Sequence, residues 1–432
     1  MEQGANVAGI AVIITVYNKE AFLRDAIDSV LSQHLCVSAD SSTPAISTLS
    51  CATPATTIPA SSASTTPVLS VILCDDGSTD SSRAICAEYA SRYSLSKNCD
   101  PDNDAIQSSE RENAEETTGG GKGGSLGKRV DGTPSCVRVF DITDGVHRGV
   151  VGNFLHCLEF ALSLNVRYIS QIDSDDILAD PDFLRRQTTF LDSHPEAQAA
   201  CSKFFLIAEK DTLATLSYRS EELLYPREST YRDLRITPER LLTRNNTLVA
   251  GGVTYRAEHL REYLDSFASA EDATQDLPLW LFLSQKGKFY GCDVQSLAYR
   301  NLAESVSRSE DIETQLKFQH ASLSTRQRFI EYLRRHIPTR PLNDATQVYS
   351  THDRSSRGCC PGGRYAREGY LKRLEGKARR LYQKKMLRHY AKLCPKDYAR
   401  QLWKALRGAP SLIFSRDVWR SVGVYLKNIR KM

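Results

Sequence analysis

The sequence lacks any long apolar segment. No stretch of its 432 residues approaches the ~18 consecutive apolar residues that a helix needs to cross a bilayer. The N-terminus also lacks a basic segment followed by an apolar core, which is the pattern of a secretory signal. We therefore expect neither a transmembrane nor a secreted protein, and we predict a cytoplasmic location.

The twelve cysteines lack the spacing of a metal site or a disulfide framework. No C-x-x-C pair is present, and no histidine spacing suggests zinc. Several cysteines fall inside predicted strands or helices, where a small buried thiol is the usual role: Cys74, Cys86, Cys157 and Cys201. This usage fits a reducing compartment and excludes the disulfide-stapled and zinc-module classes.

Acidic residues are scarce at the end of the chain. Residues 351–432 hold 22 Lys and Arg against 5 Asp and Glu, whereas the preceding residues hold 34 basic and 47 acidic groups. Within this basic part, leucines and alanines follow helical spacing, and aromatic residues such as Trp403 and Trp419 add apolar surface.

A basic amphipathic region of this kind can lie on an anionic membrane surface. We therefore predict that residues 364–432 contact such a surface, with the protein peripheral on the cytoplasmic face. The alternative is that these helices pack on the rest of the chain and leave a solvated basic face. No nucleic-acid-binding motif accompanies the basic residues, so nucleic acid is not favoured as a partner.

Three carboxylates occupy four positions, at Asp173, Asp175 and Asp176, directly after the apolar run from Val166 to Ile172. Like charges this close raise one another's pKa unless a cation neutralises them. Mg²⁺ is typically held by one or two carboxylates together with substrate phosphates. The cluster thus predicts a cation that holds a phosphorylated ligand; a solvated acidic turn before a helix is the alternative.

Two other apolar runs end in polar residues. Residues 10–16 are β-branched and lead into Tyr17-Asn18, and residues 68–74 lead into Asp75-Asp76-Gly77. Helical patterns follow both junctions. Polar residues at the carboxyl ends of strands are where open α/β sheets bind nucleotides.

Five segments follow one another along the chain in an order that is typical of a known family: IAVIITVYNKEAFLRDAIDSVLSQ, VILCDDGSTDSS, GVVGNFLHCLEFA, YISQIDSDDILADPDFL and QDLPLWLFLSQKGKFY. Together they resemble family 2 glycosyltransferases over roughly residues 10–305, and the third resembles the rhamnosyltransferase-type branch most. The resemblance implies an α/β protein with the GT-A fold, a Rossmann-like, mostly parallel central sheet flanked by helices.

The same comparison divides the chain into parts. Residues 1–310 would form the catalytic domain, with insertions at about 36–67 and 95–135 that contain too few apolar residues to offset their ordering entropy. A helical extension (311–342), a linker (343–363) and the basic amphipathic helical tail (364–432) follow.

The resemblance also implies a nucleotide site. It places Thr15, Tyr17 and Asn18 around the base, with Asp75 or Asp76 accepting a hydrogen bond from it. Two arginines, Arg148 and Arg300, are candidate donors to the diphosphate. For Arg148 an exposed loop arginine is the alternative.

For the metal, the resemblance implies Asp175 as the main ligand, Asp173 close to the ribose or the metal, and Asp176 in support. Oxygen ligands favour Mg²⁺ or Mn²⁺. Asp276 would be the general base, although an Asp at a helix start is also a common cap. Gln275 stands before it where many relatives have Glu or His.

The implied activity is an inverting transfer of a sugar from a nucleotide-diphosphate sugar to a hydroxyl. The acceptor would be a glycan or a lipid-linked molecule in cell-surface polysaccharide synthesis. The alternative is a catalytically inactive nucleotide-sugar-binding subunit of an assembly.

Overall fold

The computed structural model describes residues 9–35, 69–94, 137–219, 230–244, 246, 248–302, 309–336 and 363–429. The predicted insertions at about 36–67 and 95–135, and residues 343–362 of the predicted linker, lie outside this part of the chain.

A nine-stranded sheet forms the centre of the described chain, in the order β3-β2-β1-β4-β8-β6-β9-β5, with β7 paired to β9. The first four strands in this order are parallel: β3 (Val137–Asp141), β2 (Leu69–Asp75), β1 (Ile10–Val16) and β4 (Tyr168–Asp173). In the other half, β8 (Val253–Arg256) runs antiparallel to both β4 and β6 (Ala197–Ile207). β6 pairs in parallel with β9 (Lys288–Arg300), and the short β5 (Ile177–Leu178) and β7 (Arg232–Asp233) are antiparallel to β9.

Alternation along β1 builds a core on each face of the sheet. Ala11 and Ile13 join one cluster, while Ile10, Val12 and Ile14 join the other, because successive strand side chains point to opposite faces. Burial on both faces explains why β1 is an almost continuous β-branched run.

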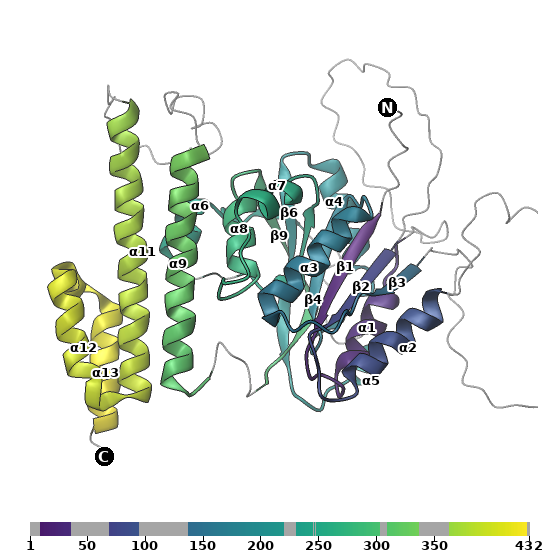
Figure 1. The fold of residues 1–432 in the computed structure, drawn as a ribbon, viewed down its shortest axis with the longest axis horizontal. Helices are drawn as coiled ribbons and strands as arrows, with labels where there is room; N and C mark the ends of the chain where they lie inside the picture. The colour runs from purple at the N-terminus through teal and green to yellow at the C-terminus, as the bar shows by residue number, and fades with distance from the viewer. Residues whose placement is uncertain are drawn as a thin grey trace, which may run out of the picture.

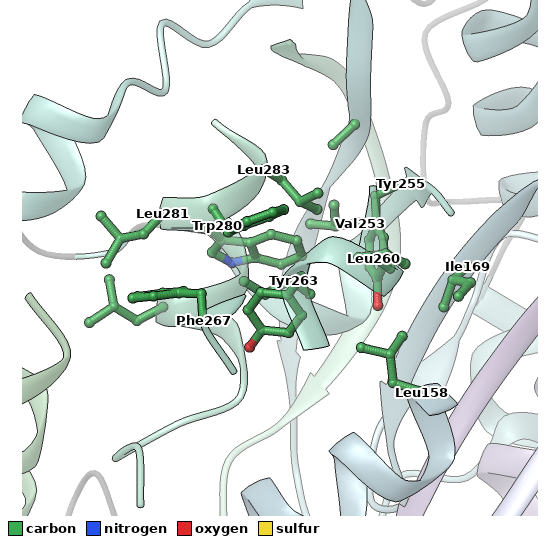
Figure 2. Packing of buried hydrophobic residues seen from close by; sticks show 14 of the residues in the cluster. Leu158, Ile169, Val253, Tyr255, Leu260, Tyr263, Phe267, Trp280, Leu281 and Leu283 are labelled. Atoms are coloured by element: carbon green, nitrogen blue, oxygen red, sulfur yellow. The ribbon is translucent and has the colours of Figure 1, made fainter. Parts of the chain in front are cut away.

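Helices cover both faces. One face carries α1 (Leu23–Leu31), α2 (Ser82–Ser94) and α4 (Phe183–Ser193). The other carries α3 (Gly149–Ser163), α7 (Leu260–Ser266) and α8 (Asp276–Leu283). Figure 2 shows this second core, where the buried Trp280 packs edge-on against Tyr255 with ring centroids 5.6 Å apart. Three short helices complete this part: α5 (Leu213–Arg219), α6 (Pro238–Thr243) and η1 (Ala250–Gly252).

Long helices extend the molecule beyond the sheet (Figure 1). α9 (Ile312–His336) and α11 (Gly363–Leu393) lie side by side, and α11 adds Leu371 and Leu374 to the second core. α12 (Pro395–Gly408), η3 (Pro410–Phe414) and α13 (Arg416–Ile429) pack on the far part of α11 around the buried Tyr398.

The predicted α/β class, with a central sheet flanked by helices and a helical C-terminal extension, is confirmed. The four cysteines predicted to be buried thiols are buried and free. In the described ranges no helix combines the length and the apolar character that a bilayer span requires.

Candidate functional site

The predicted site residues of β1, β2 and β4 meet at one edge of the sheet. β1 lies between β2 and β4, and all three are parallel, so their carboxyl ends share that edge. In the register Val16 pairs with Asp75 and Thr15 with Asp173. Thr15, Asp75 and Asp173 are therefore neighbours although they are far apart in the sequence.

The loops after β1 and β2 are tied together by polar contacts. The Ser78 hydroxyl accepts from the Asn18 backbone N–H at 2.8 Å, and the Asn18 side-chain oxygen accepts from the Thr79 N–H at 2.8 Å. Asn18 has a φ of 51°, a left-handed conformation that asparagine tolerates better than most residues. Its side chain thus braces the two loops, and Tyr17 beside it is left half-exposed.

Asp75 and Asp76 are both buried but differ in their partners. One Asp75 oxygen accepts from the N–H groups of Gly77 and Ser78, while Oδ1 is buried without a hydrogen-bond partner. For Asp76, Oδ1 accepts from the Arg148 backbone N–H at 2.6 Å, and Oδ2 lies 3.1 Å from His147 Nδ1. Asp75 is therefore the carboxylate with a free acceptor position.

Arg148 is engaged by a neighbouring carboxylate. Its guanidinium forms a two-pronged ion pair with Asp144, with an Nη1–Oδ1 distance of 2.7 Å. This contact holds the pKa of the Asp144 carboxyl below its usual range. A diphosphate would have to compete with Asp144 for the Arg148 guanidinium.

Two of the three acids after β4 remain accessible at this edge. Asp175 Oδ2 lies 2.9 Å from the Lys19 ammonium, and its side chain is 20% exposed. Burial, followed by the charges of Asp175 and Asp276, raises the pKa of the partly exposed Asp173 to about 7, while Lys19 opposes the shift. The influence of Asp276 on Asp173 indicates that the predicted base belongs to the same electrostatic cluster.

Asp176, unlike the other two acids, is fully buried. Its Oδ1 accepts from the Arg300 backbone N–H at 2.8 Å, and its Oδ2 is buried without a partner. Burial, then the charges of Asp173 and Asp175, raises its pKa well above the ordinary value.

Among the described residues no group of three or more Asp, Glu, His or Cys side chains is placed to hold a metal. The structure therefore does not bring the predicted set of three ligands together.

Arg300 is also held inside the protein. Its guanidinium donates to the carbonyl oxygens of Asp175, Ala208, Glu209 and Asp211 at 2.7–2.9 Å and lies over the Phe22 ring. Arg300 is only 3% exposed. Its hydrogen bonds connect the loop after β4 to the loop after β6. The structure does not direct this side chain toward the predicted nucleotide site.

Asp276 begins α8, as the sequence predicts for a helix start with proline in the first turn. Its Oδ1 accepts from the Leu277 N–H at 2.7 Å, and its Oδ2 accepts from the Asn246 side-chain amide at 2.5 Å. Burial raises the pKa of the Asp276 carboxyl, and hydrogen bonds including that from Asn246 oppose the shift. The buried Arg326 of α9 adds a positive charge within electrostatic range.

Lys19 and Asn246 were not predicted from the sequence. Lys19 follows β1 and its partner Asp175 follows β4, so the contact joins two loops that are far apart in the sequence. Asn246 lies 30 residues before its partner Asp276, so sequence spacing gives no indication of the contact.

Comparisons with known proteins give distant structural similarities. No protein-family model and no curated protein matches this chain. Among solved structures, S. aureus TarS 1–349 is similar at 13% identity over 98% of this chain and 92% of that chain, with a TM-score of 0.39. Its complex with UDP-GlcNAc gives 13% identity, the same shares of the two chains and a TM-score of 0.40.

The mannosyltransferase PcManGT from Pyrobaculum calidifontis, in complex with GDP-Man and Mn²⁺, is similar at 13% identity over 97% of this chain and 86% of that chain, with a TM-score of 0.37. Because these similarities are distant, the functional proposal rests on the residues of this chain.

Proposed function

We propose that this chain is an inverting glycosyltransferase that moves a sugar from a nucleotide-diphosphate sugar to a hydroxyl of a glycan or lipid-linked acceptor. The observation that supports the proposal is the position of Asp173 and Asp175 at the carboxyl edge of the parallel strands, with the charge of Asp276 acting on the Asp173 carboxyl. The segments that resemble family 2 glycosyltransferases supply these residues.

The nucleotide would bind over the ends of β1 and β2. The free Asp75 Oδ1 suits a base with a ring N–H donor, which uracil, thymine and guanine all have. The half-exposed Tyr17 ring, whose centroid is 5.5 Å from that of His147, offers an aromatic surface to the base. Asn18 would contribute by fixing the loop that carries Tyr17.

Asp173 and Asp175 are the residues that would hold Mg²⁺ or Mn²⁺. Two carboxylates plus the substrate diphosphate are a sufficient ligand set for such an ion, and neither side chain is fully buried. The ion would supply charge neutralisation at the leaving diphosphate. Lys19, 2.9 Å from Asp175, is the cation that the chain itself places there.

Asp276 would take the proton of the acceptor hydroxyl as its oxygen attacks the anomeric carbon. The bond between that carbon and the diphosphate oxygen breaks on the opposite side, so the configuration inverts and the nucleoside diphosphate leaves. Burial raises the pKa of Asp276, which brings a carboxylate closer to the range in which a general base is effective. The Asn246 amide and the α8 backbone fix its two oxygens.

The test is turnover by the purified protein with a panel of nucleotide sugars and Mn²⁺, measured as release of nucleoside diphosphate. We expect Asp276→Asn to lower kcat by at least about 10²-fold, the usual contribution of a general base, and to leave nucleotide binding unchanged. The matched control is Asp265→Asn, which changes an exposed aspartate of α7.

Full activity of Asp276→Asn would overturn the assignment of the base. Tight donor binding by the unaltered protein without turnover on any acceptor or on water would instead support the inactive binding subunit. Loss of activity in Asp265→Asn as well would show that the assay reports folding and not catalysis.

A further inference from the structure

The C-terminal unit formed by α12, η3 and α13 has apolar residues on two sides. Its inner side buries Tyr398, Leu412 and Val418 against α11. Its outer side leaves Trp403, Phe414 and Trp419 exposed by 65%, 87% and 57%. An amphipathic helix needs only one apolar side to pack, so the packing of this unit against α11 does not account for the exposure of these three rings.

One of these exposed rings, that of Trp419, is held in place by a hydrogen bond. The Trp419 indole N–H donates to the Ile413 carbonyl oxygen at 2.7 Å. This bond holds the Trp419 ring of α13 against η3, at the residue that precedes Phe414. Leu426, 49% exposed, follows Trp419 by two helical turns and lies on the same side of α13. Exposed apolar side chains therefore follow η3 and one side of α13; we call them the apolar edge.

Basic residues surround this edge. Residues 395–429 contain seven Lys or Arg and two Asp. On α13, Arg416 and Arg420 flank Trp419 and are exposed. On α12, the exposed Lys396, Arg400 and Arg407 lie seven, three and four residues from Trp403, which places them on the same outward side.

We propose that this surface, the exposed aromatic and basic residues of α12, η3 and α13, docks on a bilayer that contains anionic phospholipid. The aromatic rings would enter the interfacial region, where their amphipathic character is favourable, and the Lys and Arg side chains would contact the headgroups. The proposal is independent of the transfer reaction.

Charge and shape favour a bilayer over other occupants. A second copy of the chain would bring two surfaces of the same positive charge together. A single-stranded nucleic acid would use the basic groups and the rings, but would leave the exposed aliphatic Ile413, Leu426 and Ile429 in water. A bilayer accommodates the basic, the aromatic and the aliphatic side chains together.

The three tryptophans of the chain allow a direct test on the full-length protein. Trp280 is fully buried in the catalytic part, whereas Trp403 and Trp419 belong to the proposed surface. We expect vesicles of phosphatidylcholine with phosphatidylglycerol to shift tryptophan emission to shorter wavelength, and pure phosphatidylcholine to have little effect. Trp403→Phe with Trp419→Phe should remove the shift.

Sedimentation with the same vesicles measures affinity. Arg416→Gln with Arg420→Gln should weaken binding about 25-fold, because each basic group near an anionic surface contributes roughly fivefold. Phe414→Ser tests the apolar edge and should also weaken binding. The matched controls are Arg83→Gln on α2 and Leu206→Ser on β6, both exposed and outside this surface, which should bind as the unaltered chain does.

Three outcomes would overturn the proposal. One is an equal emission shift with pure phosphatidylcholine or no shift with any vesicle. Another is a shift with a single-stranded oligonucleotide in place of vesicles, which would identify a nucleic-acid surface. The third is a concentration-dependent increase in mass without lipid that Phe414→Ser abolishes, which would identify a second copy as the occupant.

Discussion

Asp276 shows how the environment of one residue sets its chemistry. Burial disfavours the charged carboxylate, while the Asn246 amide and the first turn of α8 stabilise it through hydrogen bonds. The opposed effects give a carboxylate whose pKa is raised but whose oxygens are fixed. Asn246 is thus a positioning residue for the proposed base.

Replacement of Asn246 tests this relation. Because the amide stabilises the charged form, Asn246→Ala should raise the pKa of Asp276 further, and the acid limb of the kcat/KM profile should move to higher pH. We expect kcat at neutral pH to fall roughly tenfold, since a hydrogen bond to a charged group contributes about 1.5–3 kcal/mol, with the donor KM unchanged. Asn246→Gln, which retains an amide, should restore part of the activity. An acid limb that does not move would contradict the role.

The limits of sequence prediction are clearest at single residues. Asp173 and Asp175 could be singled out because acids cluster at the end of an apolar run, and Asp276 because the resemblance to a known family implies its role. The partners of Arg300 could not, because they are backbone carbonyls of residues 175–211 that only the folded chain brings together. Lys19 and Asn246 were missed for a similar reason: one contact crosses between strands and the other joins a loop to α8.

At the scale of elements, local pattern predicts the parallel half of the sheet better than the rest. The apolar run at residues 10–16 coincides with β1, and the run at 68–74 lies within one residue of β2. β6 and β9 have mixed burial, and β6, β8 and β9 pair over long sequence separations, as in the pairing of Ala197 with Lys288. Their arrangement depends on packing that no local segment encodes.

The charged Lys385 ammonium, partly buried between α9 and α11, destabilises the folded protein. Lys385 of α11 lines a small cavity with Ser322 and Arg326 of α9, and burial, followed by the charge of Arg326, lowers its pKa to about 8. A lowered lysine pKa means that the folded state disfavours the charged form. The cost is complete below pH 8 and disappears as the pH rises to the ordinary value near 10.5.

Lys385→Met should therefore stabilise the protein. We expect the free energy of unfolding to rise by about 1 kcal/mol at pH 7 and by less at pH 10, as measured by chemical denaturation. Lys372→Met, at an exposed position of the same helix, serves as the control and should have little effect at either pH. Equal gains for Lys385→Met at both pH values would contradict the electrostatic explanation.

At the scale of the whole molecule, the helical extension has two different relations to the part of the chain that contains the sheet. α11 contributes Leu371 and Leu374, 3% and 2% exposed, to the core that reaches the sheet. α12, η3 and α13 instead bury their apolar residues against α11 in a separate cluster. Of the two alternatives for the predicted tail, residues 364–432, packing on the rest of the chain describes α11, while contact of the helices beyond it with an anionic membrane surface stays a prediction.

Two truncations test the contribution of α11 separately from that of α12, η3 and α13. A chain ending at residue 362 should lose about 4 kcal/mol of stability, because two buried leucines each contribute roughly 2 kcal/mol. A chain ending at residue 394 keeps α11 and should retain most of its stability. Differential scanning calorimetry of both chains provides the comparison; equal destabilisation by the two truncations would contradict the assignment of α11 to the core that reaches the sheet.

The central claim is that the carboxylates after β4 bind a nucleoside diphosphate through a divalent cation. The most direct measurement is isothermal titration of the protein with UDP, GDP and dTDP, with and without Mn²⁺, for the unaltered chain and for Asp175→Asn. We expect at least one nucleotide to bind at least about tenfold more tightly with Mn²⁺, and Asp175→Asn to abolish that gain. Affinity that is the same with and without Mn²⁺, or a gain that survives in Asp175→Asn, would contradict the account.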